Sequence, residues 1–197
     1  MHNRRLMSFI YGLFTDFRIR YALIGAKGSA NSVRKLVGFA DFLVDEPGFD
    51  EIRKILRSDD FSEHELFNGF VQFSPPDKDN LLGFLQADEP ALLDALNRAV
   101  DKPLGKFSIR QLTREDLVLV YLKVIQRDKS LRSQLLSLIE DLMESAELDF
   151  ALLTSYFNSA GESKLFESLM GKYRPGDCKT IDLRDHFAAT LPRYKGK

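Results

Sequence analysis

Apolar residues recur at the three- and four-residue spacing of an α-helix along most of this 197-residue chain. The first such stretch gathers its apolar positions on one face, opposite a basic face, and it ends near Gly25. These apolar positions are Leu6, Phe9, Ile10, Leu13, Phe14, Phe17 and Tyr21. The connections between the periodic stretches are short, and no alternating strand pattern stands out. The spacing therefore predicts an all-α protein, a compact multi-helix bundle of eight or nine helices.

Start and stop signals place further helices in the first half of the chain. A helix over 33–43 is expected to stop before Pro47. Ser62 and Glu65 have the spacing of a capping box, which predicts a helix that continues through 62–71. A short helix over 80–86 follows, and Asp88 is expected to cap another helix that carries Pro90 in its first turn.

The second half has longer periodic stretches. Thr113 is expected to cap a helix over 117–126 that is apolar nearly all round, although its Val and Ile content also fits a buried strand. Further helices are expected over 131–145, 148–158 and 163–173. The best candidate boundary lies at 101–107. We therefore expect an N-terminal helical half, 1–102, and a C-terminal helical half with a basic tail, 103–197, unless both belong to one domain.

The composition is that of a globular protein with a phenylalanine-rich core. The chain has 16 Phe and no Trp, and Phe buries a large area without a polar group that needs a partner. Its single cysteine, Cys178, excludes an intramolecular disulfide and a cysteine-based zinc site. Cysteine usage of this kind favours a reducing, cytoplasmic compartment. No apolar run approaches the length of about 18 residues that a membrane span needs.

Charge is distributed unevenly along the chain. Residues 1–36 contain one acid, Asp16, and seven basic residues that we take as the candidate binding face: Arg4, Arg5, Arg18, Arg20, Lys27, Arg34 and Lys35. The tail from residue 171 is also basic, so the net charge of −1 conceals an acidic middle. The acidic faces are expected around Asp45, Glu46, Asp59, Asp60, Glu140, Asp141 and Glu144. Such asymmetry is typical of interaction surfaces.

Motifs that carry chemistry are weak. The turn 25–29, ahead of Arg34 and Lys35, could hold a phosphate, but it does not match a phosphate-binding loop and no strand is evident before it. Asp60 and His64 have the spacing to share a helix face and bind a metal ion, yet acids in a first helical turn also complement the helix dipole. None of the three histidines lies in a catalytic motif. We therefore predict no catalytic residues, no metal site and no cofactor.

These observations favour a non-enzymatic helical adaptor subunit of a larger assembly. Its surfaces would be the basic N-terminal face and the acidic middle helices, with a protein partner or self-association. The alternative is an accessory nucleic-acid-binding protein that uses the basic N- and C-terminal segments. A membrane partner is not favoured.

Overall fold

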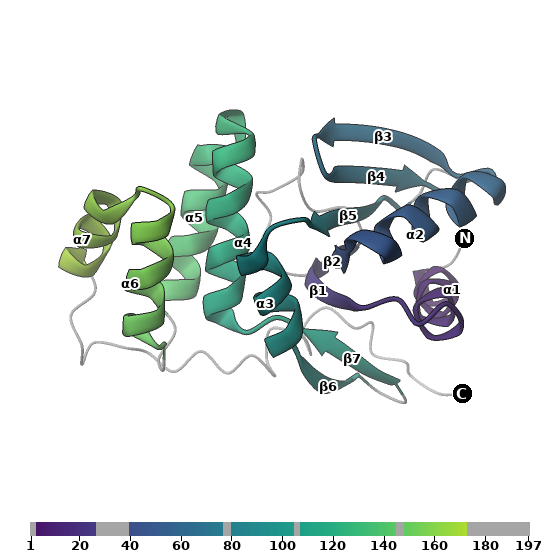
Figure 1. Cartoon of the computed structure of the whole chain (residues 1–197), viewed down its shortest axis with the longest axis horizontal. Coiled ribbons are helices and arrows are strands. Elements are labelled where there is room, and N and C mark those ends of the chain that lie inside the picture. Colours follow the sequence, from purple (N-terminus) through teal and green to yellow (C-terminus); the bar gives the residue numbers. More distant parts are fainter. Residues whose placement is uncertain (1–2, 27–39, 77–79, 105–106, 145–147, 173–197) are drawn as a thin grey trace, which may run out of the picture.

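The computed structural model describes residues 3–26, 40–76, 80–104, 107–144 and 148–172. Within these residues the chain forms a seven-stranded mixed sheet with helices on both faces (Figure 1). The strands are β1 Tyr21–Ala26, β2 Ala40–Asp45, β3 Ser62–Phe67, β4 Phe70–Ser74, β5 Leu82–Ala87, β6 Val100–Leu104 and β7 Phe107–Gln111. The helices are α1 Asn3–Asp16, α2 Glu46–Ser58, α3 Pro90–Arg98, α4 Arg114–Arg127, α5 Arg132–Met143, α6 Phe150–Ser159 and α7 Ser163–Lys172, and a 3-10 turn spans Lys129–Leu131.

The strand order across the sheet is β3-β4-β5-β2-β1-β7-β6. Strand β2 lies near the centre, where it pairs in parallel with β5 and antiparallel with β1. The β1–β2 ladder contains a bulge between Leu23 and Gly25, which brings Gly25 opposite Asp41. A bulge adds one residue to one strand and shifts the register beyond it. Strand β2 is thus paired with a neighbouring strand on each side.

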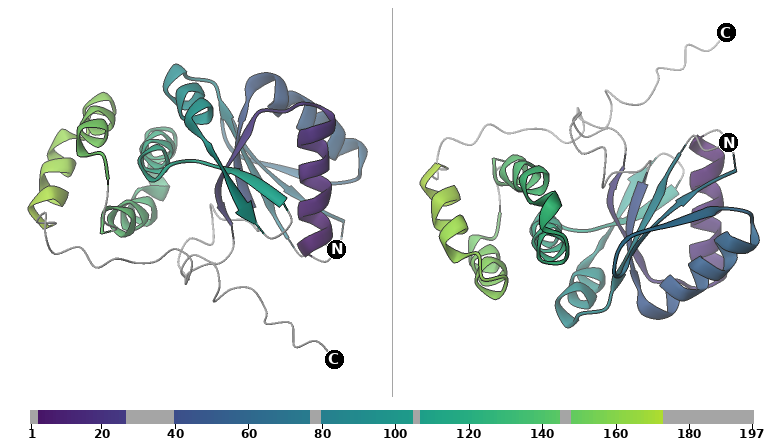
Figure 2. Two further views of the ribbon diagram at one scale, coloured as in Figure 1. Left: turned by 90° about the horizontal axis from the view of Figure 1, so that it is seen from below. Right: turned by 90° about the horizontal axis from the view of Figure 1, so that it is seen from above.

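Two hydrophobic cores lie on opposite faces of the sheet. Helices α1 and α2 cover the face that we call outer, with Ile10, Ile52 and Phe84 among its buried residues. Helices α3 and α4 cover the inner face, and α5, α6 and α7 extend that layer away from the sheet (Figure 2). Leu43 and Leu85 are buried on the inner face together with residues of α4. The sheet is thus sandwiched between two helical layers.

The all-α prediction is wrong. Seven strands occupy segments for which helices or turns were expected, and no description as a helical bundle fits a mixed sheet of this size. The physical reason is burial on both faces. All six residues of β2 and all five of β4 are buried, so apolar residues of these strands point to both faces and do not alternate regularly with polar ones. Short apolar runs of this kind cannot be told from buried helix by their periodicity.

Local signals were also misread in the first half. Pro47 lies in the first turn of α2 instead of ending a helix, and Asp45 is the N-cap that accepts a hydrogen bond from the Gly48 amide. The first helix ends at Asp16, and Arg18, two residues later, adopts a positive φ of 53°. The supposed capping box of Ser62 lies in β3, which turns into β4 through Gly69 at a φ of 82°.

The helices of the second half are confirmed. Thr113 caps α4 by accepting a hydrogen bond from the Asp116 amide, and half of the residues of α4 are buried. Helices α5, α6 and α7 lie within two residues of their expected bounds at each end. A division of the chain at residue 102 stays a prediction. Among the described residues, no helix is both long and apolar enough to cross a membrane.

Candidate functional site

A row of polar side chains and glycines crosses the inner face of the sheet. Strand pairing places Gly25, Asp41, Gly83, Gln72 and His64 opposite one another on β1, β2, β5, β4 and β3. Paired residues on adjacent strands point to the same side of a sheet. We call these five residues the inner-face row. It interrupts a surface whose other described positions are mostly apolar.

Asp41 is the charged centre of the row. It is only 3% exposed, and it lies within β2 between two glycines on the neighbouring strands. A Cβ atom on Gly83 would lie 2.0 Å from Asp41 Oδ1, so the carboxylate occupies the space that any other residue at 83 would fill. The ring of Phe70 closes the same space, with its Cζ atom 2.9 Å from that Cβ position. The glycine is therefore required for Asp41 to lie where it does.

Two further side chains set the chemistry around Asp41. Gln72 is 8% exposed, and its amide can both donate and accept a hydrogen bond. Tyr121 approaches from α4, where burial and then the negative charge of Asp41 raise the pKa of its phenol well above the ordinary value. Its hydroxyl accordingly stays protonated at neutral pH and remains a hydrogen-bond donor. The site thus brings together an acceptor, a donor and an amide.

Buried polar residues gather toward the end of the sheet at which β2 and β5 begin. Six polar residues among those described are buried, and four of them lie in the first part of β2, in the second part of β4 or just before β5: Asp41, Gln72, Ser74 and Asn80. Burying polar groups weakens a fold unless they have partners. Their concentration in one place therefore marks a candidate site rather than general core.

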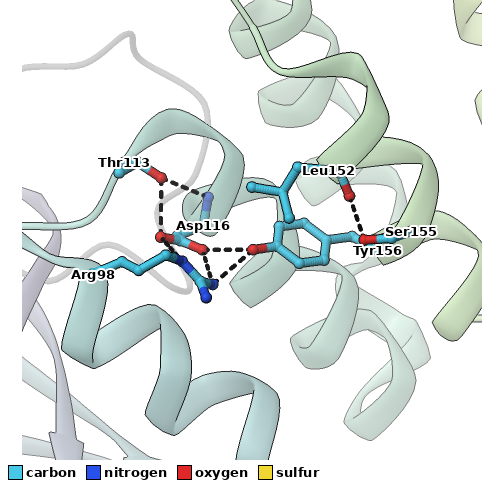
Figure 3. Close-up of polar contacts among 6 residues, drawn as sticks. All are labelled: Arg98, Thr113, Asp116, Leu152, Ser155 and Tyr156. Atoms are coloured by element: carbon cyan, nitrogen blue, oxygen red, sulfur yellow. Dashed lines mark hydrogen bonds and ion pairs between the residues drawn. The ribbon is translucent and has the colours of Figure 1, made fainter.

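The other two buried polar residues fasten elements together. Asp45 caps α2 and accepts a hydrogen bond of 2.8 Å from Arg20 Nε. Asp116 is completely buried, and it accepts hydrogen bonds from Thr113, Arg98 and the Tyr156 hydroxyl (Figure 3). Burial, together with the hydrogen bond to Asp116 and the charge of that carboxylate, raises the pKa of Tyr156. This cluster joins α3, α4 and α6.

The structure describes only part of the predicted basic face. Arg5 lies exposed on α1, and Arg18 lies exposed in the turn that follows it. Arg20 is half-exposed and pairs with Asp45, while Arg4 lies in α1 with its side chain outside the described residues. Lys27, Arg34 and Lys35 also lie outside the described residues, as does the basic tail. That these residues form one binding face stays a prediction.

The weaker motifs are placed as follows. Gly25 is the last but one residue of β1, so a strand does precede the turn that begins there, and its remaining residues fall outside the described ranges. Asp60 lies in a turn with a positive φ of 60°, and His64 lies in β3, so they do not share a helix face. Within the described part of the chain, no three His, Cys, Asp or Glu side chains gather as metal ligands would.

Asp41 was missed because the sequence placed it on a helix. Its partners Gly83 and Gln72 are far away along the chain, and only the strand register brings them together. One signal was available: Asp41 is a lone acid within the apolar run Phe39-Ala-Asp-Phe-Leu-Val44. A carboxylate in such a run is either buried with its apolar neighbours or exposed together with them. Acids are almost never buried without a specific reason.

Comparison with known proteins gives only distant similarities. No family model and no curated protein matches the chain. The solution structure of the antibiotic-resistance factor ANT(2'')-Ia aligns over 94% of this chain and 92% of its own, with a TM-score of 0.43 and 12% identity. The crystal structure of an antigenic nucleotidyltransferase-like protein from Paracoccidioides brasiliensis covers 92% of this chain and 95% of its own, with a TM-score of 0.44 and 13% identity. Similarity of this size does not extend to function.

The prediction of a non-enzymatic helical adaptor is wrong as stated. It assumed that acidic faces of bundle helices form the working surface, but the middle of the chain contributes six strands, β2 to β7, to a mixed sheet. A protein partner, self-association and contact with nucleic acid remain predictions that these findings do not test.

Proposed function

We propose that this chain is an enzyme that acts on a small polar molecule at the inner-face row, with Asp41 as its reacting carboxylate. One observation carries the proposal: a 3%-exposed acid lies within a central strand, over a glycine whose missing side chain makes room for it. Positions where a sequence departs from the rules of core packing are commonly functional. Leu43, two residues further along the same face of β2, shows the apolar residue that packing alone would favour.

The comparison with the other buried acids supports a functional role. Asp45 and Asp116 each lie at the start of a helix, where their hydrogen bonds tie elements together. Asp41 differs from both because it lies within a strand, near Tyr121 and in one row with Gln72, and these two side chains offer further polar groups. Glycine in a strand interior weakens the strand and often marks a place where a ligand approaches closely. Two glycines flank Asp41.

The proposed site offers a hydrogen-bond acceptor, the Asp41 carboxylate, and a hydrogen-bond donor, the Tyr121 hydroxyl. An ionised carboxylate accepts hydrogen bonds only, so Asp41 would hold a hydroxyl or ammonium group of the substrate. In the reaction it would take the proton from that group as a general base. The Tyr121 hydroxyl would donate to an oxygen of the same molecule. We place this activity in a reducing, cytoplasmic compartment, as the single cysteine favours.

The test uses three probes with the full chain, which differ in the groups they offer to a carboxylate. ATP with Mg²⁺ offers ribose hydroxyls and an exocyclic amine beside an anionic chain. Glucosamine offers hydroxyls and an ammonium group, and spermidine offers amines alone. We expect at least one probe to raise the melting temperature of the wild-type chain, and we expect Asp41→Asn to abolish this shift.

The matched control is Asp45→Asn. Asp45 is a buried acid on the same strand, and Asn is also a good helix N-cap, so this variant keeps the fold without touching Asp41. It should keep the wild-type response. If no probe shifts the melting temperature, or if the shift survives Asp41→Asn, the proposal is wrong.

A further inference from the structure

Helix α4 is held near both of its ends by two polar clusters of different kinds, one that joins it to α3 and α6 and one that joins it to the residues after β5. Asp116 lies in its first turn, and Lys123 and Arg127 lie in its last two turns. The rise of 1.5 Å per residue puts Asp116 and Arg127 about 16 Å apart along the helix. Tyr121, which lies near Asp41, falls between the two clusters. Whatever holds α4 therefore sets how closely this helix covers the inner-face row.

The cluster at the start of α4, which we call the anchor, is buried. The Asp116 carboxylate accepts a hydrogen bond of 2.6 Å from Arg98 Nη2 and one of 2.8 Å from the Tyr156 hydroxyl (Figure 3). Thr113 Oγ1 donates to the same carboxylate over 3.0 Å. None of the Asp116 surface is exposed. Breaking the anchor would leave a buried charge without partners, which is among the costliest changes in a fold.

The cluster near the end of α4, which we call the latch, is partly exposed. Lys123 Nζ lies 2.6 Å from Glu89 Oε2, and Arg127 Nη2 donates to Glu89 Oε1 over 2.9 Å and also to Asp88. Both acids follow β5 directly and are more than a third exposed. The hydrogen bond from Lys123 leads the interactions that lower the pKa of Glu89, so the latch is charged at neutral pH. Solvent weakens ion pairs of this exposure.

We propose that the latch is a strap that holds α4 closed over the inner-face row, and that its release lets the helical layer swing open about the anchor. This rests on the proposed function, because a substrate must reach the buried Asp41. The latch is the weaker end, since its acids are hydrated, whereas Asp116 is not. Opening at that end moves Tyr121 away from the sheet and exposes the row, while α1 and α2 stay in place on the outer face.

The test reads the accessibility of a buried thiol on each face of the sheet. Ala22 and Ala40 are both completely buried and lie on adjacent strands, but Ala22 belongs to the inner core, which includes α4, and Ala40 belongs to the outer core, which includes α1 and α2. The variants Ala22→Cys and Ala40→Cys are each made in a Cys178→Ser background, and the rate of reaction with a disulfide reagent is measured as urea is raised. Native-state opening of one layer appears as a labelling rate with a shallower urea dependence than global unfolding.

We expect the thiol at position 22, but not the thiol at position 40, to react through a shallow, local opening. Glu89→Gln should raise the labelling rate at position 22 about fivefold and leave the rate at position 40 unchanged, as loss of about 1 kcal/mol of ion pairing predicts. Added salt should act in the same direction because it screens the latch. Asp88→Asn is a second latch variant with the same expected sign. The control is Glu162→Gln, which breaks a pair with Arg132 that lies within the helical layer, and it should change neither rate.

Any of three results would overturn the latch. One is labelling at position 22 only with the full urea dependence of global unfolding. Another is an equal response of the two positions to Glu89→Gln, and the third is no response at either position. The measurement needs no ligand, so it separates the two proposals. Local opening without binding of any probe contradicts the proposed function alone, and binding without local opening contradicts the latch alone.

Discussion

Gly83 and Asp41 are register partners on β5 and β2, and a Cβ at Gly83 would lie 2.0 Å from Asp41 Oδ1. Gly83→Ala should therefore destabilise the fold by about 1–3 kcal/mol, the usual cost of overpacking a core. In an Asp41→Ala background the same change should cost at least about 1 kcal/mol less, because its main obstacle is gone. Urea denaturation of the two single variants and the double variant measures this coupling. Additive effects would mean that the two positions do not share one space.

Two tyrosine hydroxyls allow a matched test of the anchor. The Tyr156 hydroxyl donates to the buried Asp116, so Tyr156→Phe should cost about 1–3 kcal/mol, the range for hydrogen bonds to charged groups. The Tyr11 hydroxyl is buried and makes no hydrogen bond within the described residues. Tyr11→Phe should therefore be neutral or stabilising. The measurement is the free energy of unfolding of each variant. An equal loss of stability in both variants would argue against the anchor.

Acidification should weaken the contact between α2 and β3. Burial alone would raise the pKa of Glu63, but hydrogen bonds from Arg57 and Arg53 outweigh it and hold that pKa below the ordinary value. A carboxyl with a lowered folded-state pKa contributes stability above its unfolded pKa of about 4.3 and loses it as pH falls through the folded value.

The Glu63→Gln variant tests this contact. It should lower the free energy of unfolding by about 1 kcal/mol at neutral pH. The gap between variant and wild type should close as the pH falls below about 4. Unfolding curves in urea between about pH 3 and pH 7 measure both effects. A constant difference across this range would mean that ionisation of Glu63 plays no part.

The sequence predicted the second half of the fold well and the first half poorly. Helix α4 was found because Thr113 is a good cap and because the apolar stretch is too long for a typical strand. Strands β2, β4 and β5 were missed because burial on both faces removes the alternation that reveals a strand. Asn68-Gly69 was the overlooked signal, since this pair between apolar runs is typical of a hairpin turn.

The candidate site could not have been assembled from the sequence. Asp41, Gly83 and Gln72 meet only through the pairing of three strands, and a shift of one residue would turn each side chain to the other face. The bulge in β1 that sets Gly25 beside Asp41 leaves no trace in the apolar pattern. What the sequence does contain is the anomaly of single residues, such as an acid within an apolar run. Such a residue can be recognised in the sequence, but the residues opposite it on the neighbouring strands are known only once the strand register is known.

The most direct test of the central claim is backbone amide NMR of the full chain with the probe that stabilises it. Binding at the proposed site should shift the amide signals of Gly25, Asp41, Gly83 and Gln72, which adjoin one another across the sheet. The same titration with Asp41→Asn should leave these signals in place, whereas Asp45→Asn should behave as wild type. Shifts confined to α1 around Arg5 and Arg18 would contradict the account and return attention to the basic face.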